Sequence, residues 1–161
     1  MFKIDNYLVY VKDVCQVKEI KKYHDEEYYL LIPVKDKSLK INIPVKNDKI
    51  RKLISKEEID KLINNIPTIE ILDINDKFIE SEYKKLLLQG NHEDLIKIIK
   101  TTYLKNKERL DNKKKTTDRD NNYFNKAEEI LYTEFSIVLN MSYEDTKNYI
   151  INQVEKIITS K

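Results

Sequence analysis

The sequence has 161 residues but only one glycine, one cysteine and no tryptophan. One cysteine cannot form a disulfide within the chain, and with only two histidines it cannot complete a usual structural zinc site. A single glycine excludes the glycine-rich loops that cradle nucleotide phosphates. No apolar run approaches the roughly 20 residues that cross a bilayer, and residues 1–5 lack the apolar core of a signal peptide. We therefore expect a soluble, cytoplasmic protein that acts as a monomer without metal or cofactor.

The net charge is also small: 30 Lys and Arg against 28 Asp and Glu give a formal net charge of +2. This balance excludes a polybasic protein that binds nucleic acid through bulk charge. The local distribution is uneven, since residues 97–119 contain nine basic and three acidic side chains. That window predicts contacts with a phosphate backbone. A solvated face in a lysine-rich protein is the alternative, and by itself the commoner, interpretation.

The first 45 residues read as short β-strands. Runs rich in aromatic and β-branched residues are separated by polar stretches that suit turns, at residues 7–11, 14–17, 27–32 and 39–43. Four or five strands at this spacing predict a small antiparallel β-barrel rather than a βαβ unit. Tyrosine-rich strands with lysines along their edges are typical of a module that pairs an edge strand with a partner, and equally of a plain barrel.

From residue 68 onward the chain has no proline and only Gly90, which favours helices. Ser55 and Glu58 have the spacing of a capping box at the start of the first helix. We expect a second helix to end at Gly90, Asn91 to cap a third, a fourth over 123–138, and Ser142 to cap a fifth. The stretch 106–120 loses its apolar rhythm and predicts a loop or a frayed helix end. The fold class is therefore α+β, with a β domain at 1–52 and an all-α domain of about five helices at 53–161.

Catalytic motifs are missing from the sequence, including HExxH and GxSxG. Cys15 is the single thiol, and it lies in an apolar alternation that favours a buried strand cysteine over a nucleophile. His24 and His92 are interpreted as surface residues, in a turn and at a helix start. We therefore predict that the protein is not an enzyme, with an enzyme built on Cys15 as the remote alternative.

A collinear series of segments is spread along most of the length of the chain, at residues 2–10, 14–17, 27–45, 51–59, 83–101 and 127–135. It includes a strand–turn–strand pattern that ends in Pro44 and Val45. In order, these segments resemble the CarD, or CdnL-like, family of bacterial transcription regulators. The resemblance implies a Tudor-like barrel that docks on the RNA polymerase β subunit. The residues expected on the docking edge are Lys21, Lys22, Tyr23, Lys40, Ile41 and Asn42.

The resemblance further implies that the helical domain contacts promoter DNA at the upstream edge of the melted bubble and stabilises the open complex. The family uses a tryptophan as a wedge in the minor groove, and this chain has none. The wedge position falls near Leu72, with Ile71, Ile74 and Phe78 as other apolar candidates. The residues expected to face DNA are Leu72, Lys77, Phe78, Lys84, Lys85, Lys113, Lys114, Lys115 and Arg119.

Two further departures from the family pattern concern the barrel. Lys12-Asp13 replaces the glycine turn between the first two strands, and Asn42 stands where the family places an arginine before Pro-Val. Loss of that arginine removes a bidentate contact with a carboxylate. The alternative hypothesis is therefore a pure protein-interaction module that binds polymerase or another partner without wedging DNA.

Overall fold

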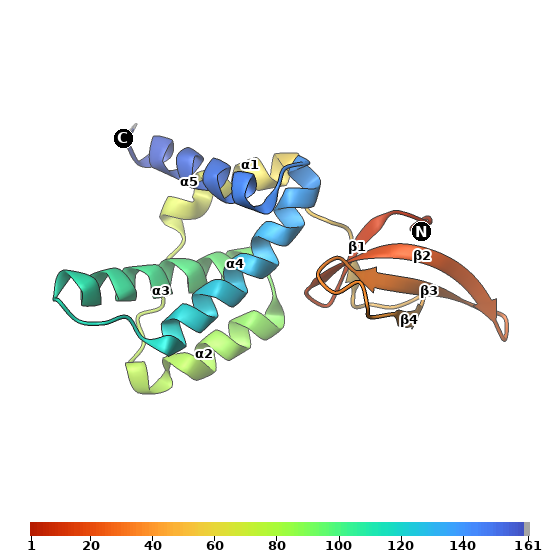
Figure 1. The fold of residues 1–161 in the computed structure, drawn as a ribbon, viewed down its shortest axis with the longest axis horizontal. Coiled ribbons are helices and arrows are strands. Elements are labelled where there is room, and N and C mark those ends of the chain that lie inside the picture. Colours follow the sequence, from red (N-terminus) through yellow and green to blue (C-terminus); the bar gives the residue numbers. More distant parts are fainter. Residues whose placement is uncertain (160–161) are drawn as a thin grey trace. The chain divides into compact units, whose positions relative to one another are not determined.

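The computed structural model describes residues 1–159, with side chains through residue 156. The chain divides into two compact units, Met1–Ile54 and Ser55–Lys161 (Figure 1). The first unit contains β1 (Tyr7–Tyr10), β2 (Asp13–Tyr23), β3 (Glu26–Pro33), β4 (Ile41–Pro44) and β5 (Ile50–Arg51). The second contains α1 (Lys56–Asn65), a short 3₁₀ turn η1 (Ile66–Thr68), α2 (Asp76–Gln89), α3 (His92–Asp111), α4 (Asp118–Leu139) and α5 (Tyr143–Thr159). The α+β prediction is confirmed, with strands first and five helices after them.

The strands form one antiparallel sheet in the order β4-β3-β2-β1-β5. Within the described residues β4 and β5 are not paired with each other, so the sheet is open where the sequence predicts a closed barrel. A register shift between Val17 and Glu19 marks a β-bulge in β2. The ladder between β1 and β2 ends at the pair Tyr7 and Gln16, so the far half of β2 pairs only with β3.

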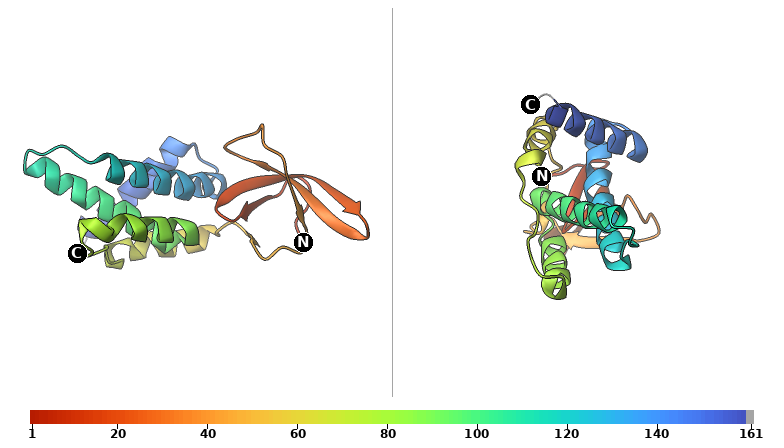
Figure 2. Two further views of the ribbon diagram at one scale, coloured as in Figure 1. Left: turned by 90° about the horizontal axis from the view of Figure 1, so that it is seen from below. Right: turned by 90° about the vertical axis from the view of Figure 1, so that its left-hand side faces the viewer.

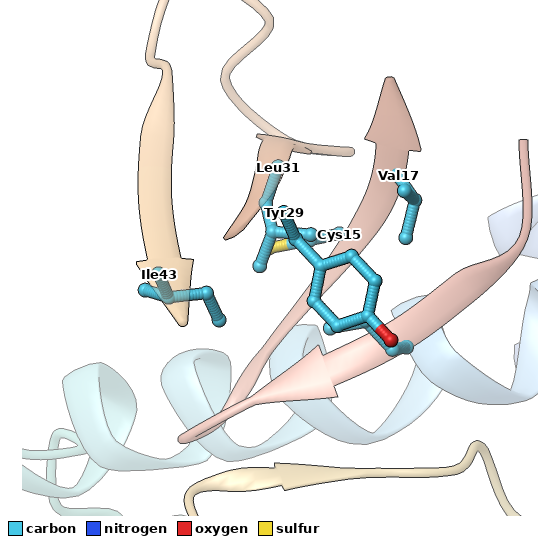
Figure 3. Packing of buried hydrophobic residues seen from close by; sticks show 6 residues of the cluster. Cys15, Val17, Tyr29, Leu31 and Ile43 are labelled. Carbon is cyan, nitrogen blue, oxygen red and sulfur yellow. The ribbon is translucent and has the colours of Figure 1, made fainter. Parts of the chain in front are cut away.

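One face of the sheet carries the core of the first unit (Figure 3). The register places apolar residues of neighbouring strands opposite one another, as in the pair Tyr29 and Ile43. The Tyr29 hydroxyl accepts a hydrogen bond from the backbone N–H of Phe2 at 3.0 Å, so the N-terminus is tied to this core. The buried members of the cluster are Leu8, Cys15, Val17, Tyr29, Leu31 and Ile43.

Both hairpin turns of the sheet use left-handed backbone without glycine. Val11 has φ 60° between β1 and β2, while His24 and Asp25 have φ 50° and 65° between β2 and β3. Two consecutive positive-φ residues are the pattern of a type I′ turn, in which an aspartate is tolerated. A β-branched residue such as Val11 is unfavourable in this region, so the turn between β1 and β2 is strained.

Local capping signals fix the ends of most helices. The Ser55 hydroxyl accepts from the Glu58 N–H at 3.1 Å, and Ser142 caps α5 by accepting from the Asp145 N–H at 3.0 Å. Gly90 ends α2 with φ 67°. Asn91 occupies the N-cap position of α3, but its side chain donates to the Asp94 carboxylate at 3.3 Å instead of capping the backbone. The predicted N-cap position of Asn91 is therefore confirmed, but without a side-chain cap hydrogen bond.

The long helices α3 and α4 lie side by side as a hairpin (Figures 1 and 2). Of the two alternatives for residues 106–120, a loop or a helix end, the first part is a helix end, because α3 continues to Asp111. Lys113, with φ 59°, follows its last turn, and the N–H groups of Lys113 and Lys114 donate to the carbonyls of Leu110 and Arg109. This is a Schellman motif with lysine at the place usually taken by glycine. No helix in the described part of the chain is long and apolar enough to cross a membrane.

Candidate nucleic-acid interface and sheet edges

Asp76, the first residue of α2, gathers basic side chains from α3 and α4. Its carboxylate lies 2.7 Å from Lys105 Nζ, 3.5 Å from Arg109 and 4.0 Å from Arg119. The hydrogen bond from Lys105, together with the charges of the three cations, lowers the pKa of Asp76. These contacts attach the last turns of α3 to α2. They explain why α3 stays helical where its apolar rhythm stops.

Asp120 extends this network into the interior of the helical unit. It is fully buried, and its carboxylate accepts from Arg119 Nε at 3.2 Å and from the Tyr83 hydroxyl at 3.2 Å. Burial and the neighbouring Asp120 carboxylate raise the pKa of Tyr83, so its phenol remains a donor. Arg119 also donates to the Asp76 carbonyl at 3.3 Å. The Arg119 guanidinium, which the sequence analysis expects to contact DNA, thus binds two aspartates within the helical unit.

The remaining cations of the basic window differ in what they contact. Lys100 donates to the carbonyls of Ile66 and Ile69 at 2.7 and 2.6 Å, and burial lowers its pKa. Lys113, Lys114 and Lys115 are exposed on the turn between α3 and α4. At one end of the helical unit α2 begins, α3 ends and α4 begins (Figure 1). We call this end the basic tip. It comprises Lys77, Lys105, Arg109, Lys113, Lys114, Lys115 and Arg119.

A polar pocket of about 380 Å³ lies within the basic tip. Its lining includes Asp76, Lys105, Arg109 and Lys114, so one wall is already neutralised by the ion pairs of Asp76. The exposed lysines of the turn are left as the cations best placed for phosphate groups.

The outward face of α2 continues from the basic tip. Phe78 is 61% exposed, and Lys77 Nζ lies 5.9 Å from the centre of its ring. Lys84 and Lys85 follow seven residues later on the same side of the helix and are exposed. Leu88, 80% exposed, ends this face. The sequence analysis did not single out Leu88, although its position lies outside the helical spacing of the buried residues Ile79, Tyr83 and Leu86.

The wedge position assigned to Leu72 is not the most exposed apolar position. Leu72 is half-buried, and its backbone N–H donates to the Thr101 hydroxyl of α3 at 2.9 Å. Ile71 is exposed to 43%, less than Phe78. Among the apolar candidates of the sequence, Phe78 is therefore the most exposed side chain.

The residues predicted to dock on polymerase fall on two different strand edges. Lys21 and Tyr23 belong to the far half of β2, where Tyr23 is 66% exposed and Lys21 pairs with Glu19 at 3.0 Å. Asn42 lies on β4, at the end of the strand order, opposite Leu30 of β3. Ile41 packs against the core cluster rather than standing free.

The predicted docking set is therefore split across the sheet. The β2 and β4 members are separated by β3, about 10 Å across two strand spacings. Lys22 is exposed on β2, and Lys40 is exposed just before β4. The two edges offer two separate places at which an extended partner segment could add a strand.

Cys15 and His92 both lie in mostly buried surroundings. Cys15 is fully buried in the sheet core, and burial, with the Asp13 carboxylate, raises the pKa of its thiol to about 11. It is therefore a protonated thiol near neutral pH. His92 contradicts its surface prediction, because its ring is 21% exposed and lies 2.9 Å from the buried Glu134 carboxylate. The described residues contain no cluster of three or more candidate metal ligands.

Comparison with known proteins finds no family model that matches the chain and no curated protein with a significant match.

Proposed function

We propose that the protein is a CarD-like transcription regulator. Its sheet unit binds the RNA polymerase β subunit, and its helical unit contacts promoter DNA at the upstream edge of the bubble and stabilises the open complex. The proposal rests on the sequence resemblance to the CarD family. The arrangement of an antiparallel sheet unit followed by a five-helix unit supports it.

One observation carries the DNA part of the proposal: an exposed aromatic ring lies beside Lys77 of the basic tip. Phe78 replaces the missing tryptophan as the side chain that wedges a base step, since phenylalanine is among the apolar residues used for this purpose. The exposed Lys113, Lys114 and Lys115 bind phosphates, which fixes the position of the wedge on the duplex. Arg119 positions α4 against α2 through Asp76 and Asp120 instead of contacting DNA.

The open edges of the sheet support the polymerase part. Edge strands present unpaired backbone groups that pair readily with another chain. The exposed Tyr23 on β2 and Asn42 on β4 distinguish the two edges. A variant that changes both edges together therefore tests docking whichever edge the polymerase uses.

The DNA contacts are tested by the salt dependence of binding to a forked promoter fragment. Replacing Lys113, Lys114 and Lys115 with Ala should reduce the slope of log affinity against log salt by about three. The matched Lys56→Ala/Lys61→Ala variant on α1 should keep the wild-type slope. Phe78→Ala should weaken binding without changing the slope, because the ring carries no charge. An unchanged slope in the triple variant would exclude the turn as a phosphate contact.

Docking is tested by a pull-down of the purified polymerase β lobe. The Tyr23/Lys40/Asn42 triple alanine variant should lose binding, whereas a Lys12→Ala/Lys37→Ala variant should retain it. If wild-type protein fails to bind the lobe, the transcription proposal is wrong. Retained polymerase binding without DNA affinity at physiological salt would favour the alternative, a pure protein-interaction module.

A further inference from the structure

The helical unit contains a second feature unrelated to the basic tip, a cavity of about 450 Å³. It lies among α1, α3, α4 and α5, and its volume falls within the range of small-molecule sites. Tyr103 and Ile151 are the exposed apolar members of its wall, so the cavity opens between α3 and α5. Its apolar lining includes Leu62, Ile96, Phe124, Leu131, Ile150 and Val154.

Tyr132 supplies a polar group in this apolar wall. The residue is only 5% exposed, and its ring packs edge-on against Tyr143. Its hydroxyl makes no hydrogen bond to the described residues. Among them, Asn106 Oδ1 is the one fully buried polar side-chain atom without a partner, so the Tyr132 hydroxyl is accessible at the cavity wall. Burial, followed by the nearby Glu128 carboxylate, raises the pKa of Tyr132. The phenol therefore stays protonated and offers a hydrogen bond to whatever enters the cavity.

The other charged groups of the wall are already matched within the protein. Glu128, buried to 6% exposure, lies 3.4 Å from Lys147. Lys100 donates to two backbone carbonyls. Glu155 also lines the cavity, so the wall holds two carboxylates and two ammonium groups. An anionic ligand would meet the carboxylates and a cationic one the two lysines, so an uncharged ligand fits this wall best.

We propose that this cavity binds a small, uncharged, mainly apolar molecule with one hydrogen-bond acceptor, such as a ketone or an ester, whose acceptor atom takes the proton of the Tyr132 hydroxyl. The apolar walls of the four helices hold the body of the ligand. The site is independent of the polymerase and DNA contacts proposed above.

The test uses the full-length protein and Prodan, a neutral naphthalene ketone whose emission reports its surroundings. Prodan should bind saturably, at one molecule per chain, with blue-shifted emission. Decanone should displace it, and the decanoate anion should do so at least about tenfold less well, because the wall excludes a further negative charge.

Two substitutions and a matched control locate the bound probe. Ile151→Trp narrows the mouth at an exposed position, where folding tolerates a larger side chain, and should abolish saturable binding. Tyr132→Phe should weaken binding about tenfold by removing one hydrogen bond. Tyr123→Phe is the control, because its hydroxyl contacts Glu80 at 3.4 Å and it does not line the cavity. Helicity is verified for each variant.

Three results would overturn the proposal. The first is the absence of saturable Prodan binding to folded wild-type protein. The second is unchanged binding to the folded Ile151→Trp and Tyr132→Phe variants, which would place the probe elsewhere. The third is a loss of affinity at high protein concentration together with dimer formation, which would show that a second copy of the chain fills the cavity.

Discussion

The two units of the protein use their charged residues in different ways. In the sheet unit, lysines such as Lys21 stand on exposed edges, and the buried cluster is built from apolar strand residues and one thiol. In the helical unit, Lys105, Arg109 and Arg119 converge on Asp76, and the buried Asp120 extends the network. Charge in the helical unit is therefore partly structural. A count of basic residues overstates the cations available to a phosphate backbone.

The largest expected effect concerns the core of the sheet unit. Leu31→Ala removes a fully buried side chain and should lower the free energy of unfolding by about 2–5 kcal/mol. Leu30→Ala, next to it on β3 but only half-buried, should cost about 1 kcal/mol or less. Urea unfolding followed by NMR amide signals of the sheet measures both. Equal losses would contradict the assignment of the core face.

The next effect concerns the network of the helical unit. Asp120→Asn removes a buried charge from Arg119 and weakens the acceptor of Tyr83, and should cost about 2–3 kcal/mol. Asp118→Asn, exposed in the same first turn of α4, is the control and should cost about 0.5 kcal/mol or less. Urea unfolding followed by circular dichroism at the helix band is the measurement. Similar stability of the two variants would show that the network adds little.

A smaller effect, of opposite sign, is expected in the first hairpin. Val11→Gly relieves a β-branched residue at φ 60° and should stabilise the protein by about 1 kcal/mol. Lys12→Gly, at the neighbouring turn position, relieves no positive φ and should not stabilise it. Thermal unfolding compares the two variants with wild type. A destabilised Val11→Gly protein would contradict the strained turn.

The smallest effect depends on pH and tests the Asp76 contacts. The pKa of Asp76 is lowered from its ordinary 3.8, so its ionised form stabilises the folded protein above that pH. The contribution is lost as the pH falls through the lower folded pKa. Because Asp76 is half-exposed, Asp76→Asn should cost about 1 kcal/mol or less at neutral pH. Urea unfolding should show the stability difference between Asp76→Asn and wild type at neutral pH and its loss at strongly acidic pH. A difference that stays the same at both pH values would contradict an ionic contribution from Asp76.

Local signals explain which parts of the fold are predictable from the sequence. The Ser55 and Ser142 caps and the Gly90 terminus act within a few residues, and the structure confirms all three. The far half of β2 and the last turns of α3 carry few apolar residues. They are held by pairing with β3 and by ion pairs with Asp76, which are partners distant in sequence.

The candidate site follows the same rule. The exposure of Lys113 and of its neighbours in the turn is readable from the polar pattern around them. Arg119 contacts the side chain and the carbonyl of Asp76 only because α2 and α4 lie together. No local sequence pattern predicts this contact. Phe78 emerges as the prominent apolar side chain because Leu72 is held against Thr101 of α3.

The central claim is that the sheet unit recruits the protein to RNA polymerase and the helical unit then stabilises melted promoter DNA. The most direct measurement is the lifetime of open promoter complexes with and without the protein. The wild type should lengthen that lifetime, Phe78→Ala should do so less, and the Tyr23/Lys40/Asn42 triple alanine variant should have no effect. A lifetime that folded wild-type protein leaves unchanged would contradict the account.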